Sequence, residues 1–121
     1  SPADLLSRPD ESNTWTGRIR GLIGRDFSKP MPDFDWIAQE LHTSPQTLRR
    51  RLKQENTSFQ EIKDLLRRDM GIYYLAHSEM PINDIAERVG FTEPSTFHRA
   101  FKKWTGVTPG AWREGERGDL V

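Results

Sequence analysis

The 121-residue sequence contains no cysteine and no long run of apolar residues. Without cysteine, disulfides, thiolate zinc sites, iron–sulfur clusters and a cysteine nucleophile are excluded. No window approaches the ~18 uninterrupted apolar residues that a membrane span needs, and the N-terminus lacks the pattern of a signal peptide. The length suits one domain, or two very small domains that share a core, and we expect a cytoplasmic protein that contacts no membrane.

The sequence also has no formal net charge, since 18 basic residues balance 18 acidic ones. The balance hides two windows without any acid, residues 41–54 and residues 94–113. These windows contain eight basic residues: Arg49, Arg50, Arg51, Lys53, Arg99, Lys102, Lys103 and Arg113. Because the position of charge decides more about partners than its sum does, the two windows favour a polyanionic partner.

Strand signals are scarce as well, because no stretch alternates apolar and polar residues for long. Helix signals are frequent: capping residues precede apolar residues at helical spacing, and proline or glycine ends the segments. The longest expected helix covers residues 59–78, and Thr92 is the expected cap of a helix near residue 94. We predict an all-α chain with one ring of the Tyr73–Tyr74 pair exposed and these aromatic residues in the core: Trp36, Phe91, Phe97, Phe101, Trp104 and Trp112.

An internal repeat is the most informative feature of the sequence. The pattern Ile-Ala-x-x-Leu at residues 37–41 recurs as Ile-Ala-x-x-Val at residues 85–89. In both copies a turn of about four residues and a proline follow, and then a basic segment in which Arg50 matches Arg99 and Lys53 matches Lys102. Each copy therefore has the plan of a helix-turn-helix unit, in which a short apolar helix precedes a capped basic helix.

The repeat predicts two homeodomain-like helix-turn-helix subdomains joined by a long linker helix. The expected division is a disordered or extraneous N-terminal segment over 1–10, a first subdomain over 11–56, the linker helix over 57–78, a second subdomain over 79–114 and a flexible tail over 115–121. A helix over residues 59–78 would be about 30 Å long, close to the ~34 Å between successive major-groove faces of B-DNA. One chain could therefore place two recognition helices in adjacent major grooves.

The ordered motifs of the second copy resemble the DNA-binding domain of the AraC/XylS family of bacterial transcription regulators. They are Ile82-x-x-Ile85-Ala86-x-x-Val89-Gly90-Phe91, Phe97-x-Arg99-x-Phe101-Lys102-Lys103, Gly106-x-Thr108-Pro109 and Trp112-Arg113. The first copy adds Ile37-Ala38-x-x-Leu41 and Ser44-Pro45-x-x-Leu48-x-Arg50, so the resemblance covers about residues 34–113, and residues 15–25 fit the family's first helix. The departures are small: Gly71 replaces a usual small helical residue, Leu52 a usual Phe and Trp112 a usual Tyr.

The resemblance implies sequence-specific binding to double-stranded DNA and regulation of bacterial transcription. Family members usually carry a separate effector-binding or dimerisation domain, mostly N-terminal, for which this chain has no room. We therefore expect either a free-standing minimal regulator or, by preference, the excised C-terminal domain of a longer effector-responsive regulator. A small-molecule effector would then act only through a domain that is not present in this chain.

The N-terminal part of the second helix in a helix-turn-helix meets base edges, while flanking polar groups hold phosphates. This rule predicts six base-reading residues, to which the family's recognition positions also map: Gln46, Arg49, Arg50, Ser95, His98 and Arg99. The predicted phosphate contacts are Ser44, Thr47, Arg51, Lys53, Thr92, Thr96, Lys102 and Lys103. Two alternatives stay open, because Arg50 and Arg99 could instead be phosphate clamps or form intramolecular salt bridges, and the hydroxyl residues could serve only as helix caps.

Other classes of function have weaker support. The three histidines lie on different expected elements, and no metal-binding histidine pair, phosphate loop or nucleophile elbow is present. We therefore expect no enzymatic activity, no metal and no cofactor. The acidic residues Asp33, Asp35 and Glu40 keep a protein-interaction module open, with RNA polymerase as the candidate second partner. RNA binding has less support, because no aromatic strand of the RRM type and no GXXG loop occurs.

Overall fold

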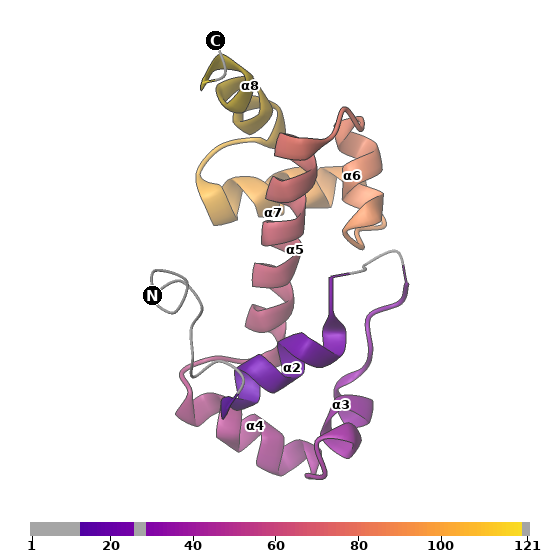
Figure 1. The fold of residues 1–121 in the computed structure, drawn as a ribbon, viewed down its shortest axis with the longest axis vertical. Coiled ribbons are helices and arrows are strands. Elements are labelled where there is room, and N and C mark those ends of the chain that lie inside the picture. Colours follow the sequence, from indigo (N-terminus) through magenta and orange to yellow (C-terminus); the bar gives the residue numbers. More distant parts are fainter. Residues whose placement is uncertain (1–12, 26–28, 120–121) are drawn as a thin grey trace, which may run out of the picture. The chain divides into compact units, whose positions relative to one another are not determined.

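The structure, a computed structural model, describes residues 13–25 and 29–119. These residues form helices and no strand, in the order α2 (Trp15–Ile23), α3 (Phe34–Glu40), α4 (Pro45–Gln54), α5 (Phe59–His77), α6 (Ile82–Arg88), α7 (Pro94–Thr105) and α8 (Pro109–Asp119) (Figure 1). The all-α prediction is therefore confirmed for the described ranges. The disordered segment predicted over 1–10 lies outside them. Of the helices found there, none has the length and hydrophobicity that crossing a bilayer would require.

The chain divides into two compact units. Unit 1 comprises residues 1–24 and 31–64, and unit 2 comprises residues 25–30 and 65–121. Unit 1 contains the first copy of the repeat as α3 and α4, and unit 2 contains the second copy as α6 and α7. The division falls within α5, a continuous helix of 19 residues, which corresponds to a length of about 28 Å.

Helix α4 is the centre of unit 1, because both α2 and α3 pack against it. Its buried side chains, Leu48 and Leu52, are four residues apart and share one helical face. The buried apolar residues of the unit come from every helix: Ile19, Ile23, Ile37, Ala38, Leu48, Leu52 and Ile62. Burying aliphatic side chains from one face of each amphipathic helix stabilises the unit and leaves the polar face of α4 free.

Unit 2 has a more aromatic core. The buried residues of its core cluster are Leu75, Ile85, Ala86, Val89, Phe97 and Phe101. Gly71 of α5 is buried beside the rings of α7, since a Cβ built on Gly71 would lie 3.4 Å from Cε1 of Phe97 and 3.7 Å from Cε2 of Phe101. The smallest side chain therefore lets both rings approach the α5 backbone, and the glycine does not interrupt the helix.

The turn of each helix-turn-helix begins with the same backbone motif. The N–H of Thr43 donates to the carbonyl of Ala38 at 3.0 Å, and the equivalent N–H of Phe91 donates to the carbonyl of Ala86 at 2.9 Å. This six-to-one hydrogen bond requires a left-handed residue just before the donor. That residue is His42 in the first copy (φ 58°) and Gly90 in the second (φ 96°). The repeat is therefore structural, although only the second copy has the residue that suits this backbone.

We expect opposite effects of substitution at these matched positions. His42→Gly should raise the free energy of unfolding by about 0.5–1 kcal/mol, because glycine adopts positive φ without the steric cost that a Cβ brings. Gly90→Ala should lower it by about 1–2 kcal/mol for the same reason. Urea unfolding of both variants measures the effects. The same sign of change in both would contradict the shared role of the two residues.

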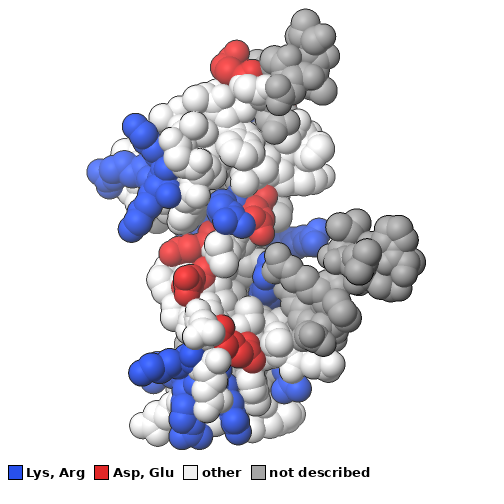
Figure 2. Space-filling view, turned by 90° about the vertical axis from the view of Figure 1, so that its left-hand side faces the viewer, with Lys and Arg blue, Asp and Glu red and all other residues white. Residues whose placement is uncertain are grey.

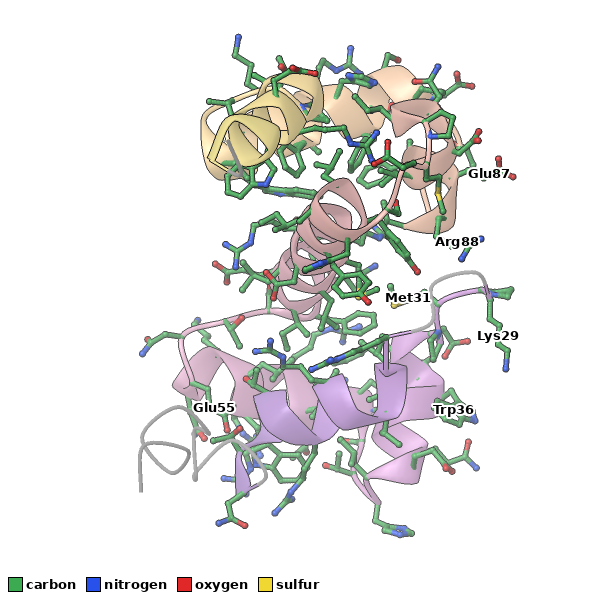
Figure 3. The ribbon with its side chains drawn as sticks, turned by 45° about the horizontal axis from the view of Figure 1, so that its top comes forward. Lys29, Met31, Trp36, Glu55, Glu87 and Arg88 are labelled. Atoms are coloured by element: carbon green, nitrogen blue, oxygen red, sulfur yellow. The ribbon has the colours of Figure 1, made fainter. Side chains whose placement is uncertain are left out.

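In unit 1 the carboxylate of Glu55, the residue that follows α4, binds the first turn of α2. Glu55, labelled in Figure 3, accepts hydrogen bonds from the N–H groups of Trp15 and Thr16, both at 2.9 Å, and from Oγ1 of Thr16 at 2.7 Å. These are donors of the first turn, which a helix leaves without internal partners. Burial raises the pKa of the Glu55 carboxyl, but the hydrogen bonds from Thr16 and Trp15 and the charge of Arg18 outweigh burial, so the net pKa is lowered.

Glu55→Gln should therefore destabilise unit 1 by about 1 kcal/mol at pH 7, as the loss of a charged helix cap does. Because the folded pKa is lowered, the contribution of Glu55 is fully present above the usual glutamate pKa of about 4.3 and is lost as the pH falls through the lowered value. Denaturant unfolding of the parent and the variant at pH 7 and at pH 3 measures this. A difference in stability that persists unchanged at pH 3 would rule out the charged cap.

Three details differ from the sequence predictions. Trp36, predicted in the core, is 42% exposed, because α3 turns Ile37 and Ala38 inward and its neighbour Trp36 projects to another side (Figure 3). Thr92 does not cap α7, whose N-cap is Glu93 and which no side chain caps. The predicted flexible tail 115–121 is helical as far as residue 119, since each further residue adds a backbone hydrogen bond that offsets the low helix propensity of glycine. The exposure of Tyr73, at 54%, agrees with the prediction.

Candidate nucleic-acid interface

In unit 1 the solvent side of α4 is a single polar and basic stripe. Ser44 begins the helix with its hydroxyl, which accepts from the N–H of Thr47 at 3.1 Å, and Pro45 takes the first helical position. Burial of Leu48 and Leu52 turns the opposite face outward. The exposed residues on that face follow helical spacing: Gln46, Arg49, Arg50 and Lys53. Arg51 is also exposed and lies to one side of this stripe.

Helix α7 of unit 2 has the same arrangement at equivalent positions. Phe97 and Phe101 are both fully buried. The stripe opposite them consists of Ser95, His98, Arg99 and Lys102, with Thr96 and Lys103 beside it. Since the two stripes match residue by residue, each unit presents one polar helix face of the same design. Figure 2 shows Lys and Arg side chains gathered on each of the two units.

His98 differs from its counterpart Arg49. It is partly buried, its Nε2 lies 3.4 Å from Oδ1 of Asn83 on α6, and its ring meets Phe97 edge-on at 6.1 Å. Arg49 is exposed, and its guanidinium carbon lies 5.2 Å from the ring centre of Phe34. The second copy therefore offers a shorter and more restrained side chain at this position than the first.

The serine and threonine residues among the predicted phosphate contacts fall into two pairs with different surroundings. Ser44 and Thr47 hydrogen bond to one another in the cap of α4, with Oγ of Ser44 2.9 Å from Oγ1 of Thr47. The capping role, one of the two alternatives, is thus present for Ser44, whereas the hydroxyl of Thr47 only accepts from that of Ser44. Thr92 and Thr96 are exposed near the start of α7, whose first turn has no side-chain cap. Because an uncapped helix N-terminus attracts anions, these two residues suit a phosphate better than a cap.

The cations of the two stripes have no acidic partners among the described residues. An ion pair among the described residues joins Arg68 to Asp69 at 3.0 Å, outside both basic helices. The salt-bridge alternative for Arg50 and Arg99 therefore has no support within the described ranges. Which of the predicted residues contact bases and which contact phosphates stays a prediction.

Arg113 is a basic residue whose role the sequence did not indicate. Arg113 belongs to the acid-free window of residues 94–113, which favours a polyanionic partner, but it is only 8% exposed. Its guanidinium donates to the carbonyls of Met80 at 2.7 Å, Leu75 and Ser78 at 3.3 Å, and Tyr74 at 3.4 Å. These carbonyls lie at the end of α5 and in the connection to α6, so Arg113 holds unit 2 together and is withdrawn from the surface. No cluster of three or more potential metal-binding side chains occurs in the described ranges.

Comparison with known proteins places this chain among bacterial regulators. A family model described as a helix-turn-helix domain matches residues 37–115. The ornithine utilization regulator of Pseudomonas aeruginosa is 38% identical over 112 residues, which cover 91% of this chain and 32% of that protein. The chain spans about a third of the length of this relative and of two mycobacterial regulators that are 37% identical to it.

Solved structures show the same arrangement of helices. The C-terminal domain of AraT, a response regulator from Geobacillus stearothermophilus, is 35% identical, with a TM-score of 0.72 and coverage of 84% of both chains. The DNA-binding domain of AdpA, solved in complex with a target DNA, is 21% identical, with a TM-score of 0.68 and coverage of 77% of this chain and 84% of that one. At that identity the second likeness concerns the fold alone.

Proposed function

Because the chain belongs to the AraC-type helix-turn-helix family of transcription regulators, we propose that it is the DNA-binding part of a longer bacterial regulator and acts in the cytoplasm. Helices α4 and α7 each enter the major groove of duplex DNA, and the linker helix α5 allows one chain to read two adjacent grooves. The matched polar stripes on α4 and α7 carry this proposal. In each stripe an arginine or glutamine can pair with a base edge, while the lysine at its C-terminal end, Lys53 or Lys102, contacts a phosphate.

Selection of duplexes from a random pool, followed by a salt titration of the selected site, tests the proposal. Two half-sites about one helical turn apart, with log K falling steeply as log salt rises, are the expected result. A single short half-site would contradict base reading by both copies. Enrichment of no sequence at any salt concentration would contradict sequence-specific binding by this chain.

Lys102→Ala should weaken binding to every duplex alike and reduce the slope of log K against log salt by about one unit, because one phosphate contact is lost. Lys102 is exposed and lies at the position of α7 that matches Lys53. Salt titrations with a selected and an unrelated duplex measure the effect. Arg68→Ala is the matched control, since it removes a cation that is already paired with Asp69. An equal change of slope in both variants would mean that Lys102 makes no specific phosphate contact.

A contact with RNA polymerase is a second candidate role, and the exposed surface of α3 favours it. Trp36 is 42% exposed, and Asp35 and Glu40 on the same short helix are also exposed. An exposed large aromatic side chain is typical of a protein-binding surface, and the carboxylates beside it would repel the phosphates of DNA. Binding of purified bacterial RNA polymerase to the immobilised chain, with Trp36→Ala as the variant, tests this contact, and equal binding of both chains would contradict it.

A further inference from the structure

A pocket of about 420 Å³ lies in unit 1 between the start of α3, the second half of α4 and the start of α5. Its floor is apolar: Leu52 is buried, and the rings of Phe34 and Phe59 contact one another at an interplanar angle of 44°, with centres 5.1 Å apart. This volume is in the range of sites that hold small molecules, and such sites typically combine an apolar lining with a few polar groups.

Cations surround this floor. Arg49 and Lys53 of α4 line the pocket, the guanidinium carbon of Arg49 lies 5.2 Å from the ring centre of Phe34, and Nζ of Lys63 lies 4.8 Å from the ring centre of Phe59. The hydroxyl residues Thr57 and Ser58 complete the lining.

No carboxylate is among the lining residues. Of the acids near them in sequence, Asp35 is exposed beside Phe34, whereas Asp33 and Glu61 take part in local hydrogen bonds. Oδ1 of Asp33 accepts the N–H of Trp36 at 2.7 Å, and the carboxylate of Glu61 lies 3.3 Å from the hydroxyl of Thr57. A carboxylate that enters the pocket would therefore meet the positive groups of Arg49 and Lys53 without an acid in the lining.

We propose that this pocket binds an organic carboxylate with an apolar body. The body packs on Leu52 and against the two phenylalanine rings, which a hydrated inorganic anion would leave uncovered. The carboxylate pairs with Arg49 and Lys53, whose charges a neutral apolar ligand would desolvate without compensation. The sequence predicts an effector only through another domain, whereas this pocket gives unit 1 a ligand site of its own.

The same pocket couples the ligand to DNA, a step that rests on the proposed function. Arg49 lines the pocket and is also a predicted base-reading residue of α4. A guanidinium that is paired with the ligand carboxylate is no longer available for a base edge. The negative charge of the ligand also repels the phosphates of the duplex. Ligand and specific duplex therefore compete, and binding of one weakens binding of the other by the same factor.

Calorimetric titration of the whole chain with naphthalene-2-carboxylate, without DNA, tests the site. Naphthalene-2-carboxamide is the neutral control of the same size, and we expect it to bind at least about tenfold more weakly. Lys53→Gln should weaken the carboxylate by about three- to tenfold. Arg51→Gln, which removes one charge from α4 outside the pocket, should leave its affinity unchanged. No binding, equal binding of the carboxamide, or an equal loss in both variants would overturn the site.

A second titration separates the site from its effect on DNA. Saturating naphthalene-2-carboxylate should weaken the selected duplex severalfold, and the carboxamide at the same concentration should not. If the carboxylate binds but leaves duplex affinity unchanged, the coupling is wrong and the site stands. Failure of the chain to bind any duplex would overturn the proposed function and with it the coupling, whereas the titration without DNA reports on the pocket independently.

Discussion

Replacing Arg113 with alanine should lower the free energy of unfolding by about 3–4 kcal/mol, a large share of the roughly 5–15 kcal/mol available to a domain. The guanidinium is almost fully buried and donates to four backbone carbonyls, with Met80 the closest at 2.7 Å. Alanine would remove these donors; the carbonyl of Tyr74 would keep the N–H and Oγ of Ser78 as partners, whereas the other three carbonyls would lose the guanidinium inside unit 2, which costs more than the hydrogen bonds alone contribute. Urea unfolding measures the change.

Two further variants make this expectation specific. Arg113→Lys should retain less than half of the free energy of unfolding that Arg113→Ala loses. A single ammonium group cannot donate to all four carbonyls that the planar guanidinium contacts. Glu114→Ala, which changes the exposed neighbour, should shift the stability by no more than about 0.5 kcal/mol. If Arg113→Ala and Glu114→Ala had similar small effects, the internal hydrogen bonds of Arg113 would not stabilise unit 2.

Arg49→Ala should weaken the selected duplex by about 1–3 kcal/mol, a factor of roughly 5 to 150, and weaken unrelated DNA far less. Arg49 is exposed on the stripe of α4, opposite Leu48 and Leu52, and forms no ion pair with another described residue. Its fork of donors suits guanine, whose two major-groove acceptors it can bind together. Competitive binding with the two duplexes at one fixed salt concentration gives the ratio of the losses.

Arg51→Ala is the matched control, because Arg51 lies on the same helix outside the stripe. We expect it to weaken both duplexes by the same factor, as a phosphate contact does. If Arg49→Ala also weakened both equally, Arg49 would be a phosphate contact, and the base reading of the first copy would depend on Gln46 and Arg50.

The helices were predictable from the sequence because their determinants are local. Ser44 followed by Pro45, the four-residue spacing of Leu48 and Leu52, and the recurrence of the Ile-Ala pair act within one or two helical turns. The same spacing that buries Leu48 and Leu52 turns Gln46, Arg49 and Arg50 outward. The polar stripe of α4, and by the repeat that of α7, could therefore be identified before any tertiary contact was known.

The sequence alone misplaced those residues whose environment comes from distant segments. Arg113 resembled a surface cation, and only packing of α8 places it beside carbonyls 33 to 39 residues earlier in the chain. Trp36 resembled a core residue, and the direction in which the seven-residue helix α3 packs leaves it exposed.

Residue types, caps and periodicity thus determined the helices and their polar faces, because these depend on backbone hydrogen bonds between near neighbours. Tertiary structure decided three other features: the burial of Arg113, the hydrogen bonds of Glu55 to the start of α2, and the cationic pocket over Phe34 and Phe59. Each of them joins groups about 25 to 40 residues apart, and no local pattern records which distant groups the packing of helices brings within hydrogen-bonding or van der Waals distance.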